Sequence, residues 1–475
     1  MRRLVGLVTL ALIAGSALAD GFSDKSLFQP EELSEDPAAK ANWKLTRTAA
    51  DKVDGPIPLI LIHGLSTDFW EPFTAWASDS EEAAAFRNQF QLWKYLQPND
   101  GVNAAVGYSS AYPGFEESLA AYLNRFILGA QEEGSEGSDG ATYFFPAGPF
   151  CILTHSQGGV TARAFLANFP DMAERCLSVV TLSAPHMGSP GATPQWVRYT
   201  LSQLGPLQRQ IFRQPLRGAF ASFLLNDYLS TARQSDMDMG WANLDAQGIG
   251  GIPTREFRVW MPLQGFQPAT LSARDGNGTD ARELPDFDDD SFEPAALLPN
   301  FCGGINEITP QERGDINMSK FFLYGAYLEP GNNWEELRDQ AEQAYGGGNT
   351  GAIYDTALRL LSVLMAQIET NGSHAPLGTY LLSDGFVPLQ SQLMLDGKEE
   401  KLIYKTQTVN GCTLPLRPFE PRMKLIRDHT LANPNRLRVL RGWSHYDTVT
   451  GRYDEDTKTS PLFPKVADDL LSMLS

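Results

Sequence analysis

A single serine stands at an abrupt change of pattern in the segment CILTHSQGGVTARAFL, residues 151–166. An apolar run typical of a buried strand stops at His155, and a helical pattern begins directly after Ser156. Such a corner exposes the serine hydroxyl and aims the first amide groups of the helix at the same place, where they can stabilise a negative oxygen. Gly158 and Gly159 are small enough for a tight corner. These residue types predict that Ser156 is a nucleophile, which requires a nearby base.

The corner resembles the nucleophile elbow of the α/β-hydrolase family, which carries the motif Gly-x-Ser-x-Gly. Thr154 stands at the first glycine position, and this larger side chain should displace a neighbouring helix or strand slightly. The resemblance covers about residues 50–190 and 377–475, and within the family it is to secreted lipases and esterases. It implies an α/β-hydrolase fold with a mostly parallel central sheet flanked by helices, and the chain order serine, acid, histidine.

The histidine of such a site should follow the last core strand, and the chain has six histidines. The segment RLRVL (436–440) predicts that strand, and His445 follows it. We therefore expect His445 to be the base rather than a histidine of a surface loop. The other five precede that strand: His63, His155, His186, His374 and His429. The segment around His186, APHMGSP, resembles a loop beside such sites, so this residue is either a wall of the site or part of a turn without chemistry.

The acid is expected in LLSDGFVPLQSQ, because Asp-Gly-x-Val-Pro resembles the acid loop of these lipases. The carboxylate of Asp384 would accept a hydrogen bond from imidazole Nδ1, fix the tautomer and stabilise the imidazolium. An Asp-Gly pair also forms ordinary turns, which is the alternative interpretation. Asp396 and Asp428 are the other candidates for the acid.

Two backbone N–H groups should form an oxyanion hole beside the serine. One belongs to Gln157, the residue after the nucleophile. The other is expected from Leu65, because LIHGL matches the family's His-Gly-x loop. Gly64 permits a close approach of that loop, while His63 and, in the elbow, His155 are expected to be supporting residues.

The elements that position these residues alternate between strand and helix, which predicts β-α-β units and a parallel sheet. Short continuous apolar runs indicate strands that are buried on both faces. Strands are expected at 56–64, at 102–109 and in the first part of 176–191, with helices at 80–95, 115–128 and 463–474.

The chain divides into five segments by composition. Two arginines, an apolar run and a small-x-small cleavage site predict a secretory signal peptide over 1–19, and hence a secreted or periplasmic protein. Residues 20–50 form a polar leader, and the core is expected in two parts, 51–190 and 377–475. Residues 191–376 are too long for a loop and predict an inserted cap or lid.

Three patterns stand out within the insertion. The segment 204–225 mixes apolar residues with arginines, which suits either a lid with an apolar face or a helix packed on the core. The segment REFRVWM (255–261) is a candidate for a further core strand. Apolar residues at helical spacing predict a helix over 353–372.

A loop rich in acidic residues and glycine lies at 274–290. Its Asp275, Asn277 and Thr279 alternate as oxygen ligands do in calcium loops, although glutamate is missing from the twelfth position. The loop is therefore either a calcium site or a solvated acidic loop.

Four cysteines in an exported chain predict two disulfides. We favour Cys151–Cys176, because each residue begins an apolar run and the two starts lie side by side in a strand-helix-strand unit. The remaining pair would be Cys302–Cys412. The alternative is that some of the four are buried free thiols.

The net charge of −19 argues against binding to nucleic acid or to an anionic membrane. The resemblance implies a serine ester hydrolase of the lipase or esterase type, which acts through an acyl-enzyme on an ester or lipid substrate, in transient contact with a lipid interface, and needs no cofactor. An acyltransferase or a polyester depolymerase would use the same three residues. A non-enzymatic binding protein on this fold would typically have lost one of them.

Overall fold

A computed structural model describes a core of strands and helices and several other short segments. The described residues are 44–48, 53, 55–64, 70–96, 118–137, 139–186, 189, 255–261, 265–271, 318–328, 358–359, 362, 368–371, 383–393, 404–409, 412–418 and 436–474.

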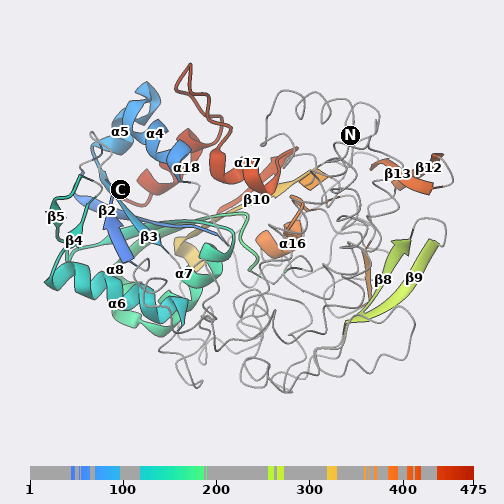
Figure 1. Cartoon of the computed structure of the whole chain (residues 1–475), viewed down its shortest axis with the longest axis horizontal. Coiled ribbons are helices and arrows are strands. Elements are labelled where there is room, and N and C mark those ends of the chain that lie inside the picture. Colours follow the sequence, from blue (N-terminus) through green and yellow to red (C-terminus); the bar gives the residue numbers. More distant parts are fainter. Residues whose placement is uncertain are drawn as a thin grey trace, which may run out of the picture.

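A seven-stranded sheet forms the centre of the described core (Figure 1). Only β1 runs antiparallel to its neighbour, and the other six strands are parallel. In spatial order the strands are β1 (Lys44–Arg47), β3 (Phe90–Leu96), β2 (Ile57–Ile62), β6 (Phe150–His155), β7 (Cys176–Leu182), β10 (Phe321–Tyr327) and β14 (Leu437–Arg441).

Helices cover both faces of this sheet, so the core has three layers (Figure 1). One face carries α6 (Leu119–Glu132), α7 (Gln157–Asn168) and α8 (Pro170–Arg175), and we call their shared cluster the α6-side core. The other face carries α4 (Glu71–Asp79), η2 (Glu81–Ala83), α5 (Ala84–Arg87), α17 (His445–Thr450) and α18 (Phe463–Leu471), which share the α4-side core.

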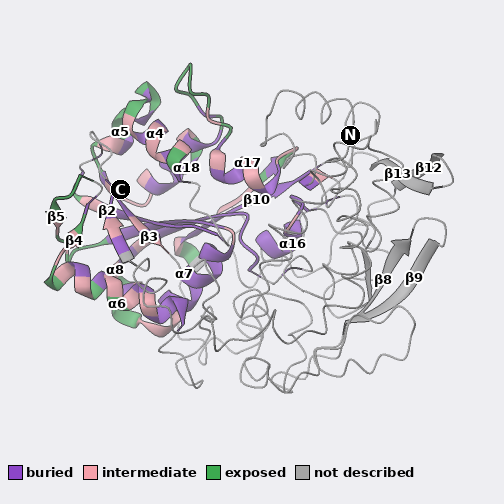
Figure 2. Cartoon of the chain, viewed as in Figure 1, coloured by how far each residue is buried: buried purple, intermediate pink, exposed green. Residues whose placement is uncertain are grey.

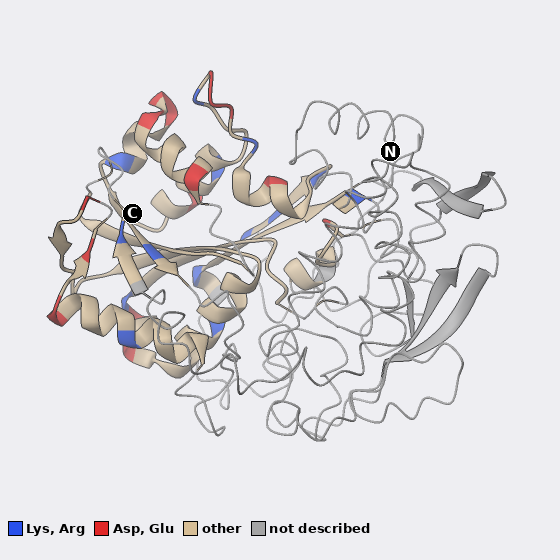
Figure 3. Ribbon diagram, viewed as in Figure 1, with Lys and Arg blue, Asp and Glu red and all other residues tan. Residues whose placement is uncertain are grey.

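The central strands are hydrophobic on both faces because both are covered. In β2, Ile60 and Ile62 pack in the α6-side core while Leu59 and Leu61 pack in the α4-side core. The strands β2, β6 and β7 carry no charged residue, and the charges lie on helices, loops and other strands (Figure 3). The sheet and the helix faces toward it are correspondingly buried (Figure 2). This agrees with the fold class expected from the sequence.

The remaining described elements are short. A two-stranded sheet joins β4 (Ser135–Glu136) to β5 (Thr142–Tyr143), and another joins β12 (Tyr404–Val409) to β13 (Cys412–Pro418). The turn η8 (Met318–Lys320) leads into β10, and α16 (Leu389–Gln392) packs on that strand through Leu389 and Leu393.

Residues 44–47 of the expected leader form strand β1 of the central sheet, and three other expected elements also differ from the structure. The segment 80–95 is not one helix, because β3 begins at Phe90. The segment 255–261 is a strand, β8 (Arg255–Met261), but it pairs with β9 (Gly265–Leu271) and β11 (Ile368–Asn371) in a separate sheet. The additional core strand expected there is instead β10. The helix expected over 353–372 is also wrong at its end, where β11 lies.

The Cys151–Cys176 disulfide expected from the sequence is wrong, because both cysteines are buried free thiols. The ladder pairs Cys151 with Ser178 and Cys176 with Phe150, with an irregularity after Phe150. Cys151 packs in the α4-side core and Cys176 in the α6-side core. Cys302 lies outside the described residues, so the pair Cys302–Cys412 stays a prediction.

Several expectations concern residues that the structure does not describe. These are the segments 1–19, 20–43 and 204–225, the strand expected at 102–109, and the calcium candidates Asp275, Asn277 and Thr279. Among the described residues, no three His, Cys, Asp or Glu side chains are grouped so that they could hold a metal ion. No helix in the described part of the chain is long and apolar enough to cross a membrane.

Candidate active site

Ser156 lies between β6 and α7 in a strained conformation, with φ 52° and ψ −129°. Residues other than glycine rarely adopt a positive φ, and such strain persists only where the surroundings enforce it. Here the N–H of Ser156 donates to the carbonyl of Leu182 at 2.9 Å, and its carbonyl accepts from Gly159 at 3.0 Å. The strand on one side and the helix on the other therefore hold the serine on the predicted corner.

Glycines surround this corner because other residues would collide with it. A Cβ on Gly64 would lie 2.7 Å from Cβ and 3.3 Å from Oγ of Ser156. A Cβ on Gly158 would lie 2.5 Å from the carbonyl oxygen of Ile62. The loop after β2 therefore approaches the serine directly, as expected for Gly64.

Thr154 fits because the first turn of α7 leaves space for it. A Cβ on Gly159 would lie 3.2 Å from Oγ1 of Thr154 and 2.4 Å from Cβ of Ala184. The threonine is fully buried, and its hydroxyl donates to the carbonyl of Val180 at 3.4 Å. The absent side chain of Gly159 thus accommodates the residue that replaces the first glycine of the motif.

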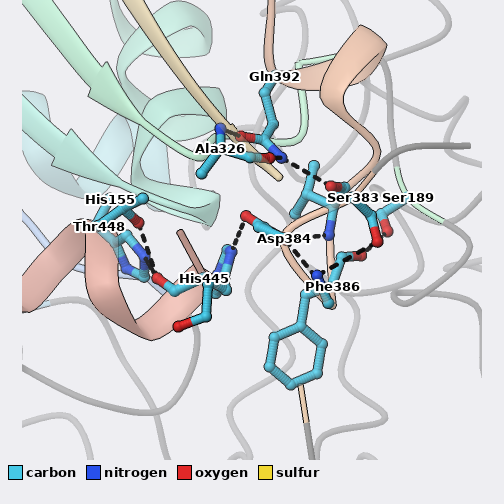
Figure 4. Close-up of polar contacts among 12 residues, drawn as sticks. His155, Ser189, Ala326, Ser383, Asp384, Phe386, Gln392, His445 and Thr448 are labelled. Atoms are coloured by element: carbon cyan, nitrogen blue, oxygen red, sulfur yellow. Dashed lines mark hydrogen bonds and ion pairs between the residues drawn. The ribbon is translucent and has the colours of Figure 1, made fainter. Parts of the chain in front are cut away.

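His445 and Asp384 form a direct hydrogen-bonded pair, although 61 residues separate them (Figure 4). Nδ1 of the histidine lies 2.7 Å from Oδ2 of the aspartate, and the backbone N–H of His445 donates to the Asp384 carbonyl at 2.9 Å. The aspartate is completely buried, while the histidine side chain keeps 11% of its surface exposed. The imidazole is therefore accessible from outside the protein, while the carboxylate is not.

The second oxygen of Asp384 accepts two backbone hydrogen bonds from its own loop. Phe386 N–H donates to Oδ1 at 3.0 Å and Val387 N–H donates at 2.8 Å. The Asp-Gly pair does form a turn, in which Gly385 has φ 107°. The turn interpretation is therefore compatible with the acid interpretation, because the turn orients the carboxylate.

His155, the residue before Ser156, contacts His445 directly (Figure 4). Its Nε2 lies 3.0 Å from the carbonyl oxygen of His445, and the two rings are 4.6 Å apart. Burial, followed by the proximity of His445, lowers the pKa of His155 well below its usual value. A neutral His155 can donate to that carbonyl, so it fixes the main chain of His445 beside the elbow.

The expected oxyanion hole is partly within the described residues. Gln157 is the first residue of α7, so its N–H is among the amide groups that a helix leaves without an internal partner. Leu65 lies outside the described residues, as do Asp396 and Asp428. His63 is buried, and its Nδ1 lies 2.6 Å from the carbonyl oxygen of Gly64 in the same loop.

His186 is completely buried. Its Nε2 lies 3.1 Å from Oγ1 of Thr181, and its carbonyl accepts from Arg163 at 2.9 Å. Burial, followed by the charge of Arg163, lowers its pKa well below the usual value. The structure thus places His186 in the interior, where its imidazole contacts β7 and its backbone carbonyl accepts from α7.

Two polar residues near the acid were not expected from the sequence. Gln392 bonds to the backbone of Ala326 and to Val387, and the hydroxyl of Ser189 donates to the carbonyl of Phe386 (Figure 4). No spacing of residue types marks either one, because their partners are backbone atoms brought together by the fold.

No family model and no curated protein matches the sequence. Among solved structures, the mature form of a Bacillus licheniformis lipase is 11% identical; the match covers 86% of this chain and 93% of that one, with a TM-score of 0.32. Lipase 1 from Pelosinus fermentans is 13% identical over 88% and 99% of the two chains, with a TM-score of 0.34. Phospholipase PlaB from Legionella pneumophila is 12% identical over 87% and 60%, with a TM-score of 0.32.

The architecture of the described core assigns the fold on its own. The strained residue Ser156 joins a central parallel strand to a helix, and the hydrogen-bonded residues Asp384 and His445 follow later strands, in the chain order serine, aspartate, histidine. The protein has the α/β-hydrolase fold.

Proposed function

We propose that the protein is a serine ester hydrolase with Ser156 as nucleophile, His445 as base and Asp384 as the acid that orients the base. The observation that carries the proposal is the 2.7 Å hydrogen bond between Asp384 and Nδ1 of His445, whose ring packs against His155. A carboxylate bound at Nδ1 leaves Nε2 as the basic nitrogen. The position of His155 directly before Ser156 supports the delivery of that nitrogen to the serine.

In the first step, the proton of Ser156 moves to Nε2 of His445 while Oγ bonds to the carbonyl carbon of an ester. The carbonyl electron pair moves to its oxygen, and the N–H of Gln157 would donate to that oxyanion. Leu65 is the residue expected to supply the second donor. The imidazolium is stabilised by Asp384, which accepts from its Nδ1.

In the second step, the carbonyl re-forms and the bond to the alcohol oxygen breaks. The alcohol leaves with the proton from Nε2 of His445, and Ser156 remains acylated. A water molecule then gives a proton to Nε2 of His445 and attacks the acyl carbon. The bond between that carbon and Oγ of Ser156 breaks, Oγ takes the proton back from His445, and the carboxylic acid is released.

Hydrolysis of p-nitrophenyl esters of increasing acyl length tests the proposal. We expect the wild type to turn over at least one member of the series, and Ser156→Ala to lose at least about a thousandfold in kcat, because no other group supplies the nucleophile. Ser472→Ala is the control, since Ser472 is an exposed serine at the C-terminal end of α18. An inactive wild type, or full activity in Ser156→Ala, would contradict the proposal.

We also propose that the protein is exported with removal of residues 1–19. The support is the sequence pattern of this segment, with its basic start, apolar run and small residues before Asp20. Mass spectrometry of the protein secreted by its host should find an N-terminus at or near Asp20. Recovery of the chain with Met1 attached would show that the segment is not cleaved.

A further inference from the structure

We propose that Gln392 is a positioning residue, which holds the Asp384 loop on the end of β10 so that the carboxylate meets His445. This inference rests on the proposed function, because it assigns a role within the same site. Gln392 is completely buried at the end of α16, and its side chain points to both β10 and the acid loop (Figure 4).

The side-chain amide of Gln392 takes the place of a neighbouring strand at the end of β10, where β7 no longer pairs with it. β7 pairs with β10 up to Leu182, which lies opposite Tyr324. The next residue, Ser183, donates its N–H to the Tyr324 carbonyl but has φ 53°, so the chain turns away there. Peptide groups alternate in direction along a strand, so Ala326 presents its N–H and C=O to the same side as Tyr324.

Gln392 satisfies both of these backbone groups. Its Oε1 accepts from Ala326 N–H at 2.6 Å, and its Nε2 donates to the Ala326 carbonyl at 3.0 Å. A primary amide has the donor and acceptor of a peptide group plus one additional N–H. That additional N–H donates to the carbonyl of Val387 at 2.7 Å, so both hydrogens on Nε2 are used.

Val387 connects Gln392 to the carboxylate of Asp384. The N–H of Val387 donates to Oδ1 of Asp384 at 2.8 Å, and its carbonyl also accepts from the Asp384 N–H at 3.3 Å. Oδ2, on the other side of the carboxylate, then lies 2.7 Å from Nδ1 of His445. The chain of contacts therefore runs from β10 through Gln392 and Val387 to the acid and the base.

The first test compares Gln392→Met, which keeps the side-chain length and removes all three hydrogen bonds, with Gln91→Met. Gln91 is the control because both ends of its amide are also hydrogen-bonded: Nε2 donates to the Gly55 carbonyl at 3.1 Å and Oε1 accepts from Nε1 of Trp93 at 3.0 Å. It lies on β3, near the opposite edge of the sheet from β10. We expect Gln392→Met to lose roughly ten- to a hundredfold in kcat with KM nearly unchanged, because misplacing a catalytic group by about 1 Å can cost that much. Gln91→Met should keep the wild-type kcat per molecule of folded protein.

The second test is the downfield proton resonance of His445 Nδ1 in protein labelled with ¹⁵N-histidine. We expect the resonance in the wild type and its loss or upfield shift in Gln392→Met, because the Asp384–His445 bond loosens. An unchanged resonance, or a wild-type kcat for Gln392→Met, would overturn the inference. This readout does not depend on turnover, so an inactive wild type would contradict the proposed function and leave the positioning role to be decided by the resonance.

Gln392→Glu keeps the test decisive if the methionine variant does not fold. Its carboxyl can donate one hydrogen bond when protonated and none when ionised, so its activity relative to wild type should fall as the pH rises. Parallel pH profiles for Gln392→Glu and wild type would overturn the inference, because a purely structural defect scales activity equally at every pH.

Discussion

At the scale of single residues, the candidate site depends on how one buried carboxylate is held. Asp384 accepts two hydrogen bonds from backbone N–H groups at Oδ1 and one from imidazole Nδ1 at Oδ2. The carboxylate therefore cannot rotate without losing hydrogen bonds. His445 is fixed in the same way at its main chain, through Asp384 and His155.

Replacement of the acid by its amide should show this dependence. In Asp384→Asn, Oδ1 can still accept from the loop, but an NH₂ group then faces Nδ1 and favours the wrong tautomer of His445. We expect kcat to fall by on the order of a thousandfold or more, measured on the best p-nitrophenyl ester. Asp468→Asn, on the exposed face of α18, should be as active as wild type.

Comparing Asp384 with Asp396, another candidate for the acid, gives a further test. Asp396→Asn should depress turnover less than Asp384→Asn does. The reverse ranking would move the acid to Asp396 and would contradict the site described above.

At the scale of elements, the elbow depends on how closely α7 packs against the strands. The Cβ of Ala184, after β7, occupies the space that a side chain on Gly159 would need. The helix can lie this close only because Gly158 and Gly159 open its first turn. The orientation of the serine is thus a property of helix packing as well as of local strain.

Two glycine substitutions separate packing from helix propensity. Gly159→Ala should lower the free energy of unfolding by about 1–3 kcal/mol, because its methyl group would overlap Ala184 at 2.4 Å. Gly129→Ala in α6 should raise it by about 0.5–1 kcal/mol, since no atom lies within 4 Å of the added carbon and alanine favours the helix. Urea unfolding measures both changes. A change of the same sign in the free energy of unfolding of the two variants would contradict the packing argument.

The free thiols of β6 and β7 give a second test at this scale. Burial raises the pKa of Cys151 to about 12 and that of Cys176 further, so neither thiolate is available at neutral pH. We expect neither residue to react with iodoacetamide in the native protein, and both to react after unfolding without a reductant. Peptide mapping by mass spectrometry would show the labelled sites, and a Cys151–Cys176 peptide would contradict the structure.

At the scale of the whole molecule, burial of histidine links stability to pH. Burial lowers the pKa of both His155 and His186 below the usual 6.5, so the folded protein keeps them neutral where the unfolded chain would bind protons. The unfolded state then binds more protons than the native state below about pH 6.5. The stability that depends on these neutral histidines is present above that pH and is lost as the pH falls.

The free energy of unfolding should therefore decrease between pH 7 and pH 5. The slope is as much as about 1.4 kcal/mol per pH unit for each histidine that must gain a proton. Urea unfolding at pH 7, 6 and 5 measures it, and His186→Asn should reduce the slope by removing one of the two groups. A stability that is constant over this range would show that the histidines are not held neutral.

The parts of the fold that sequence reasoning predicted are those that local patterns determine. The elbow is marked by an apolar run, two glycines and a helical period within the segment 151–166, and β14 and α18 begin within one residue of their predicted starts. The position of the acid was expected from the short motif that includes Asp384, which the structure places against His445.

The missed features depend on contacts that are distant in the sequence. The run FFLYGAY of β10 is apolar enough to be a strand, but it lies inside a segment that was assigned to the insertion. The sequence of β3 does not indicate a strand clearly, because its apolar residues do not alternate regularly with polar ones. Gln392 was missed because its partner Ala326 is 66 residues away and takes part through its backbone.

The junction between β10 and the acid loop has a consequence for how this chain can evolve. The N–H of Leu328, directly after β10, donates to the carbonyl of Ser383 at 2.9 Å, so the chain leaves and re-enters the core at one point. With both ends fixed together, doubling the length of the intervening sequence costs only about 0.6 kcal/mol in loop closure. A change in the length of the segment 329–382 therefore need not move Asp384, as long as Leu358 keeps its place beside Gly385 and β11 keeps its pairing with β8.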